Sequence, residues 1–342
     1  MFYLLSFITG ILECGWIAFG VIQALPLCQI LCYPLAYHIG NLFPQPFSLN
    51  KGSLRLIGFV SIICSFITFA ATGTVCTILT CISLFGISSV IQSVRSGLKS
   101  DGNRFIKRVF RVCGFVLAPL ACVIPSEILS VSAIIALYTL KNYSGICKID
   151  ILKNQDGYSC VMLFHQLHYF FYAHITLAAM SIMLVNKESE IGVVFGVLLF
   201  IATWITYMLV EPIVSMLTNR ILLVFYIGHI GISIILLSMS FLTNDLMFIV
   251  LWIITGFGGG VVYTISARAK LVCSYDKKSM TISENIGHTL GLLTATVIAS
   301  FFEKASLHIM LILGAASALF TVLSMTFILR KENRYEIIKN NS

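Results

Sequence analysis

The sequence predicts an all-α integral membrane protein with twelve transmembrane helices arranged in two six-helix lobes. Three observations lead to this prediction: the composition, the spacing of the apolar segments and the placement of the basic residues. Hydrophobic residues make up 58% of the 342 residues and charged residues only 11%, whereas soluble domains carry about 25% charged residues. A soluble core cannot bury so much apolar surface, but a bilayer can, and the chain is long enough for about a dozen spans of about 20 residues.

Breaks between the apolar runs define the expected spans. Residues 2–43 are too long for a single crossing, because a helix rises about 1.5 Å per residue. Pro26 and Pro125 divide two such stretches, since proline interrupts the helical hydrogen bonds. No Lys or Arg precedes the first run, so we expect a retained span and not a cleaved signal. The predicted spans lie at about residues 2–23, 26–43, 54–72, 75–95, 108–124, 127–141, 160–185, 191–211, 220–242, 246–266, 283–302 and 307–329.

The basic residues are distributed unevenly among the loops. All of the 22 Lys and Arg residues except Lys187 and Lys304 fall after even-numbered spans or in the C-terminal segment. Because basic residues favour the cytoplasmic side, we expect a multi-pass protein of the cell or inner membrane with both termini in the cytoplasm. We therefore interpret the net charge of +8 as the basic residues that orient the chain in the lipid bilayer, and we expect no nucleic-acid partner.

The longest polar loop divides the chain into halves. We expect an N-terminal six-helix lobe at residues 1–141, a cytoplasmic linker at 142–159, a C-terminal six-helix lobe at 160–330 and a cytoplasmic tail at 331–342. The 11 cysteines include no Cys-x-x-Cys pair. A zinc or disulfide framework is therefore not expected, and neither is a cofactor.

The twelve spans, the cytoplasmic termini and the linker after the sixth span together resemble the major facilitator superfamily, and two short segments resemble it more loosely. The segment 92–97 places Arg95 near the cytoplasmic end of the fourth span, where many members carry an arginine. The segment 114–119 resembles the glycine–proline element in the fifth span of antiporters. The family's signature loop between the second and third spans is absent, since residues 40–55 contain no acidic side chain. The resemblance covers the whole chain and implies a monomeric secondary transporter whose halves rock around a central site.

The seventh span carries an unusual polar stripe. Ionisable groups are costly in hydrocarbon and usually face a cavity or a partner helix. A helix advances about 100° per residue, which puts His174 on the opposite face from the other polar residues. We expect the stripe either to line a hydrated cavity or to bond neighbouring helices, and it consists of His165, His168, Tyr169, Tyr172 and Thr176.

The first span contains Glu13, the most deeply placed carboxylate. Burial disfavours the charged form of a carboxylate, so such a group can carry a proton. The alternative is a permanent bond to a neighbouring helix. The same face of this helix carries Trp16 together with Ser6, Thr9 and Gly20, and Gln23 follows near its end. We expect Glu13 and His168 to couple transport to protons, and Trp16 and Gln23 to line the cavity.

Near the start of the eleventh span, Glu284 and His288 are four residues apart and share a helix face. This spacing suits a gate or a coupling pair, and Glu284 equally suits a helix start. Arg95, beside a basic loop, is expected to act as a gate or as a determinant of topology.

These observations favour a proton-coupled secondary transporter of a small organic molecule and not an enzyme. We expect the protein to export a drug, a metabolite or a siderophore-like compound, because an aromatic, weakly charged cavity suits an amphiphilic substrate. Two alternatives stay open: a membrane enzyme that holds a metal at His165 and His168, and a non-transporting sensor, suggested by the missing loop motif. No metal site is predicted, since His38, His229, His288 and His308 are scattered along the chain.

Overall fold

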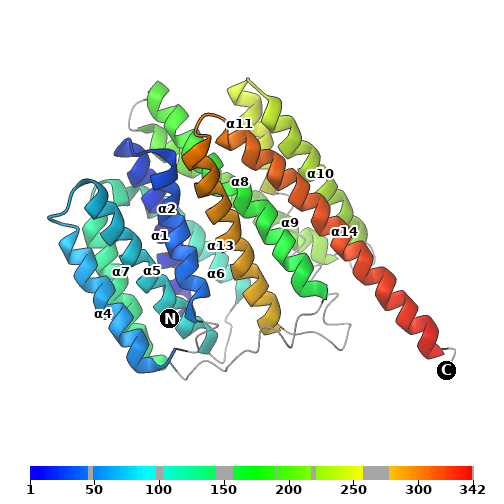
Figure 1. The fold of residues 1–342 in the computed structure, drawn as a ribbon, viewed down its shortest axis with the longest axis horizontal. Helices are drawn as coiled ribbons and strands as arrows, with labels where there is room; N and C mark the ends of the chain where they lie inside the picture. Colours follow the sequence, from blue (N-terminus) through cyan, green and yellow to red (C-terminus); the bar gives the residue numbers. More distant parts are fainter. Residues whose placement is uncertain are drawn as a thin grey trace. The chain divides into compact units, whose positions relative to one another are not determined.

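The computed structural model describes residues 1–44, 49–97, 103–143, 157–188, 191–216, 221–256 and 277–340. Within these ranges the protein is entirely helical, without strands, and its α-helices correspond one to one to the predicted segments (Figure 1). Their bounds are α1 (Phe2–Ile22), α2 (Leu27–Leu42), α4 (Lys51–Ile67), α5 (Gly73–Gly97), α6 (Arg104–Leu117), α7 (Pro125–Thr139), α8 (Gly157–Glu188), α9 (Ile191–Met216), α10 (Ile221–Phe241), α11 (Asp245–Ile254), α13 (Lys277–Phe301) and α14 (Ser306–Asn340). Two short 3-10 helices, η1 (Ala118–Cys122) and η2 (Leu140–Asn142), follow α6 and α7.

Six of the described helices are long and apolar enough to cross a membrane, namely α1, α5, α8, α9, α10 and α14. The helices α7 and α11 are apolar but shorter. The membrane assignment is thus supported for these six, and the full count of twelve spans stays a prediction. Side chains on α4 agree with a lipid environment, because Leu56, Phe59, Ile63 and Phe66 are exposed along one side of this helix. In water such a stripe would promote association.

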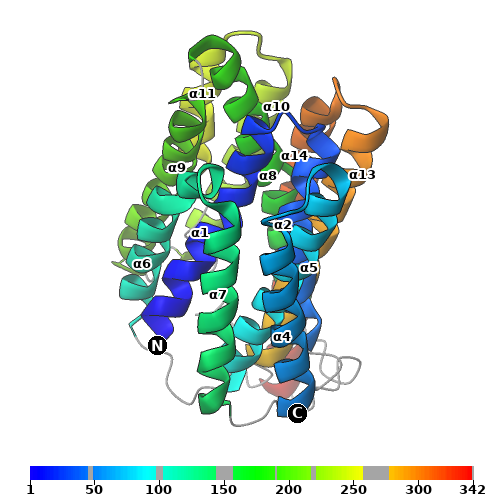
Figure 2. The same cartoon turned by 90° about the vertical axis from the view of Figure 1, so that its left-hand side faces the viewer.

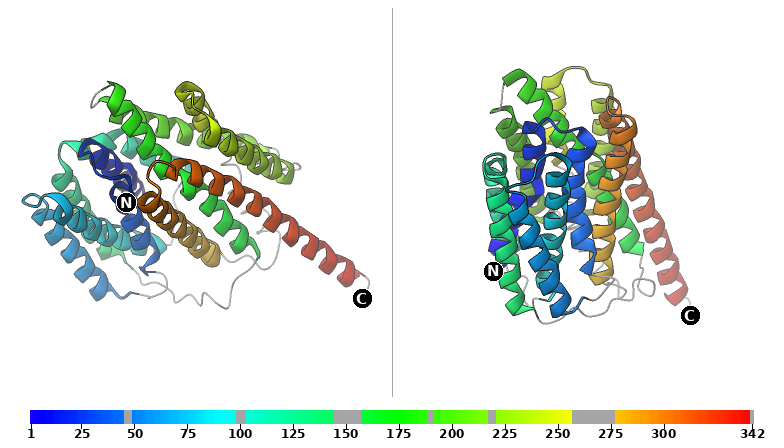
Figure 3. Two further views of the ribbon diagram at one scale, coloured as in Figure 1. Left: turned by 45° about the horizontal axis from the view of Figure 1, so that its top comes forward. Right: turned by 60° about the vertical axis from the view of Figure 1, so that its left-hand side comes forward.

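Two boundaries differ from the predicted ones. α6 begins at Arg104, before the predicted start at residue 108, because Asn103 caps it: its side-chain oxygen accepts from the amides of Phe105 at 2.9 Å and Ile106 at 3.2 Å. Arg111, one of the basic residues that the sequence attributes to topology, lies well inside this helix. At the other end of the chain, α14 continues as one unbroken helix through the expected tail to Asn340 (Figure 3).

The contacts divide the chain into two compact units. The first unit contains Met1–Ile149, Ala173–Trp204 and Leu292–Leu307. The second contains Asp150–Tyr172, Ile205–Gly291 and His308–Ser342. The predicted six-helix lobes stay a prediction, and most of the predicted linker at 142–159 lies outside the described residues.

Close helix packing in the first unit depends on small residues. In Figure 2, α1 and α6 lie side by side, and Gly10 of α1 faces Gly114 of α6. A Cβ atom on Gly114 would overlap the carbonyl oxygen of Phe7, and one on Gly10 would overlap that of Arg111. Small residues allow membrane helices to approach this closely. The glycine of the antiporter-like segment is therefore a packing residue here.

We expect Gly114→Ala to lower the stability of the protein by about 1–3 kcal/mol, because overpacking forces backbone shifts of this cost. The thermal midpoint of the purified protein in detergent measures the effect. The matched control is Gly231→Ala in α10, where an added Cβ meets nothing within 4 Å. Alanine is the better helix former, so the control should be neutral or stabilising. Equal midpoints for the two variants would contradict the close crossing of α1 and α6.

Candidate functional site

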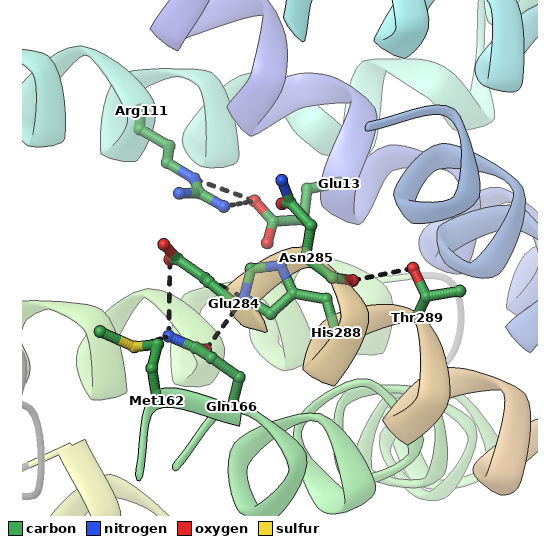
Figure 4. Close-up of polar contacts among 8 residues, drawn as sticks. All are labelled: Glu13, Arg111, Met162, Gln166, Glu284, Asn285, His288 and Thr289. Carbon is green, nitrogen blue, oxygen red and sulfur yellow. Dashed lines mark hydrogen bonds and ion pairs between the residues drawn. The ribbon is translucent and has the colours of Figure 1, made fainter. Parts of the chain in front are cut away.

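The first unit contains a buried ion pair between Glu13 and Arg111 (Figure 4). Oε2 of Glu13 accepts from Nε of Arg111 at 2.9 Å and also from Nη2 of the same guanidinium. The glutamate side chain is 1% exposed and that of Arg111 29%. A carboxylate so deeply buried needs a charged partner, because removing it from water costs several kcal/mol in real proteins.

Aromatic rings surround the guanidinium of Arg111 within the same unit. Its central carbon lies 4.6 Å from the ring centroid of Trp204 and 5.8 Å from that of Phe115. Arginine over an aromatic face gains cation–π attraction, which is stronger where water is excluded. Trp204 therefore helps to hold Arg111 in the position that meets Glu13.

A second arginine reaches the same face of α1. Nη2 of Arg95 donates to Oγ1 of Thr9 at 2.8 Å, one turn before Glu13. In the part of the chain that the structure describes, no carboxylate forms an ion pair with Arg95. Two guanidinium groups thus accompany one carboxylate, so this region carries an excess of positive charge.

Two histidines also approach Glu13 within this unit. One ligand atom each from Glu13, His38 and His174 lie within 4.8 Å of one another, and the rings of His38 and His174 are 5.9 Å apart. His174 was expected on the face opposite the polar stripe, and here it joins the glutamate. Because Arg111 already holds the carboxylate, a cation would have to compete with a guanidinium at this position.

Other predicted residues of the first unit take different positions. Trp16 and Thr176 are both buried, and neither the indole nitrogen nor the threonine hydroxyl finds a hydrogen-bond partner among the described residues. Such unsatisfied groups suit a bound solute or water. Gln23 is the C-cap of α1 and is exposed, so it lies apart from the buried stripe.

The second unit contains a cluster of three histidines. His165 and His168 of α8 meet His229 of α10, with ring centroids between 4.9 and 5.5 Å apart. Nδ1 of His165 lies 3.2 Å from Nε2 of His229. His165 and His168 were predicted on one stripe, whereas His229 was set aside as one of the histidines scattered along the chain. The only signal available was a histidine in the middle of an apolar run.

Tyrosines extend this histidine cluster along α8. The ring of Tyr172 lies 6.1 Å from that of His168 and packs edge-on against Trp252 at 5.8 Å. Tyr169 contacts Tyr172 at 5.9 Å and is only partly buried. The predicted stripe from His165 to Tyr172 therefore exists as a set of adjacent rings.

A polar bridge joins α8 and α13 in the second unit (Figure 4). Nε2 of His288 lies 2.9 Å from Oε1 of Gln166, and Nε2 of Gln166 lies 3.4 Å from Oε1 of Glu284. His288 also stacks on Phe170 at 4.0 Å. The predicted Glu284 and His288 are indeed neighbours, 3.9 Å apart, and Gln166, which the sequence analysis overlooked, connects them.

Comparison with known proteins identifies the fold. No family model matches the chain, and no curated protein sequence matches it. Solved structures do match. The nucleoside transporter NupG is 12% identical with a TM-score of 0.61, over 96% of this chain and 98% of that one. A bacterial homologue of the iron transporter ferroportin is 15% identical with a TM-score of 0.62, over 96% and 98%.

A structure described as a bacterial metal transporter is 16% identical with a TM-score of 0.61, over 96% of this chain and 97% of that one. The chain therefore has the fold of these transporters. The three named structures are transporters and not enzymes. They support the expectation of a multi-pass membrane protein, although at these identities the likeness concerns the fold alone.

We expect Arg111→Gln to destabilise the protein, because it leaves the Glu13 carboxylate buried without its charge partner. Removing one member of a buried pair costs about 3–5 kcal/mol, and partial exposure of Arg111 places the expected loss near the lower value. The double variant Glu13→Gln/Arg111→Gln should recover much of this loss, since it buries no charge. Thermal midpoints of the wild type, both single variants and the double variant measure the coupling. Strictly additive losses would contradict the ion pair.

Proposed function

We propose that this protein is a secondary active transporter that moves a small organic molecule across the membrane by alternating access. The observation that carries the proposal is the buried Glu13–Arg111 ion pair inside a fold shared with known transporters. Intramembrane ionisable residues are costly and commonly mark substrate or proton pathways. A purely structural contact between α1 and α6 would not require charges, because apolar side chains of similar volume are often at least as stable.

In this proposal Glu13 is the proton carrier. When the carboxylate is ionised it binds Arg111, which stabilises the arrangement of α1 and α6 described above. When a proton neutralises Glu13, the ion pair is lost and the guanidinium becomes available to another anion. Proton uptake and substrate binding at Arg111 are thereby coupled, because both change the partner of the same guanidinium.

The charges of the first unit bear on the substrate. The two guanidinium groups of Arg95 and Arg111 outnumber the single carboxylate of Glu13. Trp16 and Thr176 offer buried polar atoms without a hydrogen-bond partner among the described residues. We propose an amphiphilic organic substrate with an anionic group, such as a secreted metabolite or a siderophore. Export, both termini in the cytoplasm and a monomeric state belong to the same proposal.

Two other functions would lead to different results. A membrane enzyme using His165 and His168 should retain stoichiometric iron or zinc through purification, should lose it in His165→Ala, and should move no solute across the membrane. A sensor of the same fold should bind and be stabilised by a ligand that it never transports. The fold favours the transporter over the enzyme, since the matching structures named above are transporters.

The proposed coupling is tested by Glu13→Gln and His168→Ala in proteoliposomes. A thermal-shift screen of organic anions, amphiphilic drugs and siderophores at two pH values first selects the substrate. We expect Glu13→Gln to abolish most of the accumulation driven by a pH gradient, because the glutamine amide cannot take up and release a proton as a carboxylate does. Exchange without a gradient should be less affected, since it requires no net proton movement.

The matched control is Glu127→Gln, which removes an exposed carboxylate in the first turn of α7 and should leave gradient-driven transport unchanged. Unaltered accumulation in both Glu13→Gln and His168→Ala would refute the assigned roles. A substrate that binds but never crosses the membrane would favour the sensor instead.

A further inference from the structure

We propose that His165, His168 and His229 form a binding site for a divalent transition-metal ion. One ring nitrogen from each of the three residues lies within 4.8 Å of one from each of the others. All three side chains are buried, with relative exposures of 7%, 2% and 0%. The site shares His168 with the proposed proton coupling but contains neither Glu13 nor Arg111. Metal binding by the purified protein, together with variants of His165 and His229, therefore tests the site separately from the coupling.

Hydrogen bonding prepares His229 to act as a ligand. Its Nδ1 lies 3.0 Å from the carbonyl oxygen of Phe225, one turn earlier on α10. A carbonyl can only accept, so Nδ1 must carry the proton, and Nε2 of the neutral ring presents its lone pair to the cluster. Histidines that bind metals characteristically donate their other ring N–H to such a carbonyl. His229 therefore already has the orientation and the tautomer that a metal requires.

The other two rings also have a nitrogen to offer. Nδ1 of His165 lies 3.2 Å from Nε2 of His229. In the metal-free protein the Nδ1–H group of His165 can donate to that lone pair. When both nitrogens bind the ion, the neutral ring of His165 carries its proton on Nε2 instead. Nδ1 of His168 is buried and finds no hydrogen-bond partner among the described residues. Three adjacent buried imidazoles cannot all be charged, since the repulsion would be too large.

The ligand chemistry selects the class of metal. Imidazole nitrogen suits zinc, copper, nickel, cobalt and iron(II), whereas magnesium and calcium prefer oxygen. Metal–nitrogen bonds are about 2.0–2.1 Å long in zinc sites, so tetrahedral ligands stand about 3.4 Å apart. The ring nitrogens lie within 4.8 Å of one another. They therefore need to move closer by only about 1–1.5 Å to bind one zinc ion. Three protein ligands leave a fourth position open, as in sites that bind an exchangeable group.

The charge of the site indicates reversible binding. The three ligands are neutral, so a divalent ion would keep its full charge in a poorly polarisable interior, which is costly. Affinity should then follow the usual order, in which copper and zinc bind more tightly than cobalt and cobalt more tightly than iron(II). The Glu13, His38 and His174 group has a carboxylate, but Arg111 occupies it, which disfavours a second cation there.

Cobalt(II) is the probe for the test, because its visible absorption reports nitrogen coordination directly. The full-length protein is purified with a histidine-free affinity tag, stripped with chelator and titrated with cobalt(II), and bound metal is counted by elemental analysis after dialysis. We expect the wild type to bind one equivalent of cobalt(II) with a visible absorption band. In His165→Ala, His168→Ala and His229→Ala this binding should be lost, or its affinity should fall at least about tenfold. Magnesium at the same concentration should not compete.

The matched control is His308→Gln. This histidine lies in the same unit, and its Nδ1 is 2.6 Å from the carbonyl oxygen of Ser240, outside both histidine groups. It should retain the cobalt spectrum and stoichiometry of the wild type. If an alanine variant fails to fold, the corresponding glutamine variant replaces it, and zinc should raise the thermal midpoint of the wild type but not of that variant. A wild type without the cobalt band, or a triple variant that keeps it, would overturn the proposal.

Discussion

The close crossing of α1 and α6 is the contact on which the charged centre of the first unit depends. Gly10 and Gly114 lack the side chains that would separate the two helices, and Arg111 of α6 meets Glu13 of α1 across this crossing. A buried carboxylate in a membrane helix is tolerable only with such a partner. The ion pair to which we assign proton coupling therefore depends on the close packing of the two helix backbones.

The two units contain different chemistry. The first has two guanidinium groups and one carboxylate close to α1, whereas the second has a cluster of neutral imidazoles shared by α8 and α10. Charged groups suit an anionic organic solute, and imidazoles suit a transition metal. The two proposals, an anionic organic substrate for the first unit and a transition metal for the second, therefore rest on separate groups of side chains.

Helix positions were largely predictable, because a membrane span needs a long apolar run and proline or polar residues end it. Polar stripes on single helices were predictable as well, since they follow from the period of the helix. Thr9 and Glu13 of α1 and His165 and His168 of α8 were identified in this way. Their partners Arg95, Arg111 and His229 were either assigned to other roles or overlooked, because each lies on another helix at a sequence distance that no local pattern reveals.

The sequence by itself therefore determined the class of protein, the helical segments and the buried polar face of each helix, since these depend on composition and on a period within one segment. Only the tertiary structure decided which faces meet. It placed Arg111 against Glu13 and His229 against His165 and His168, and it connected Glu284 to His288 through Gln166. The physical reason is that helix pairing depends on small residues and shape across the contact, which are properties of two segments together.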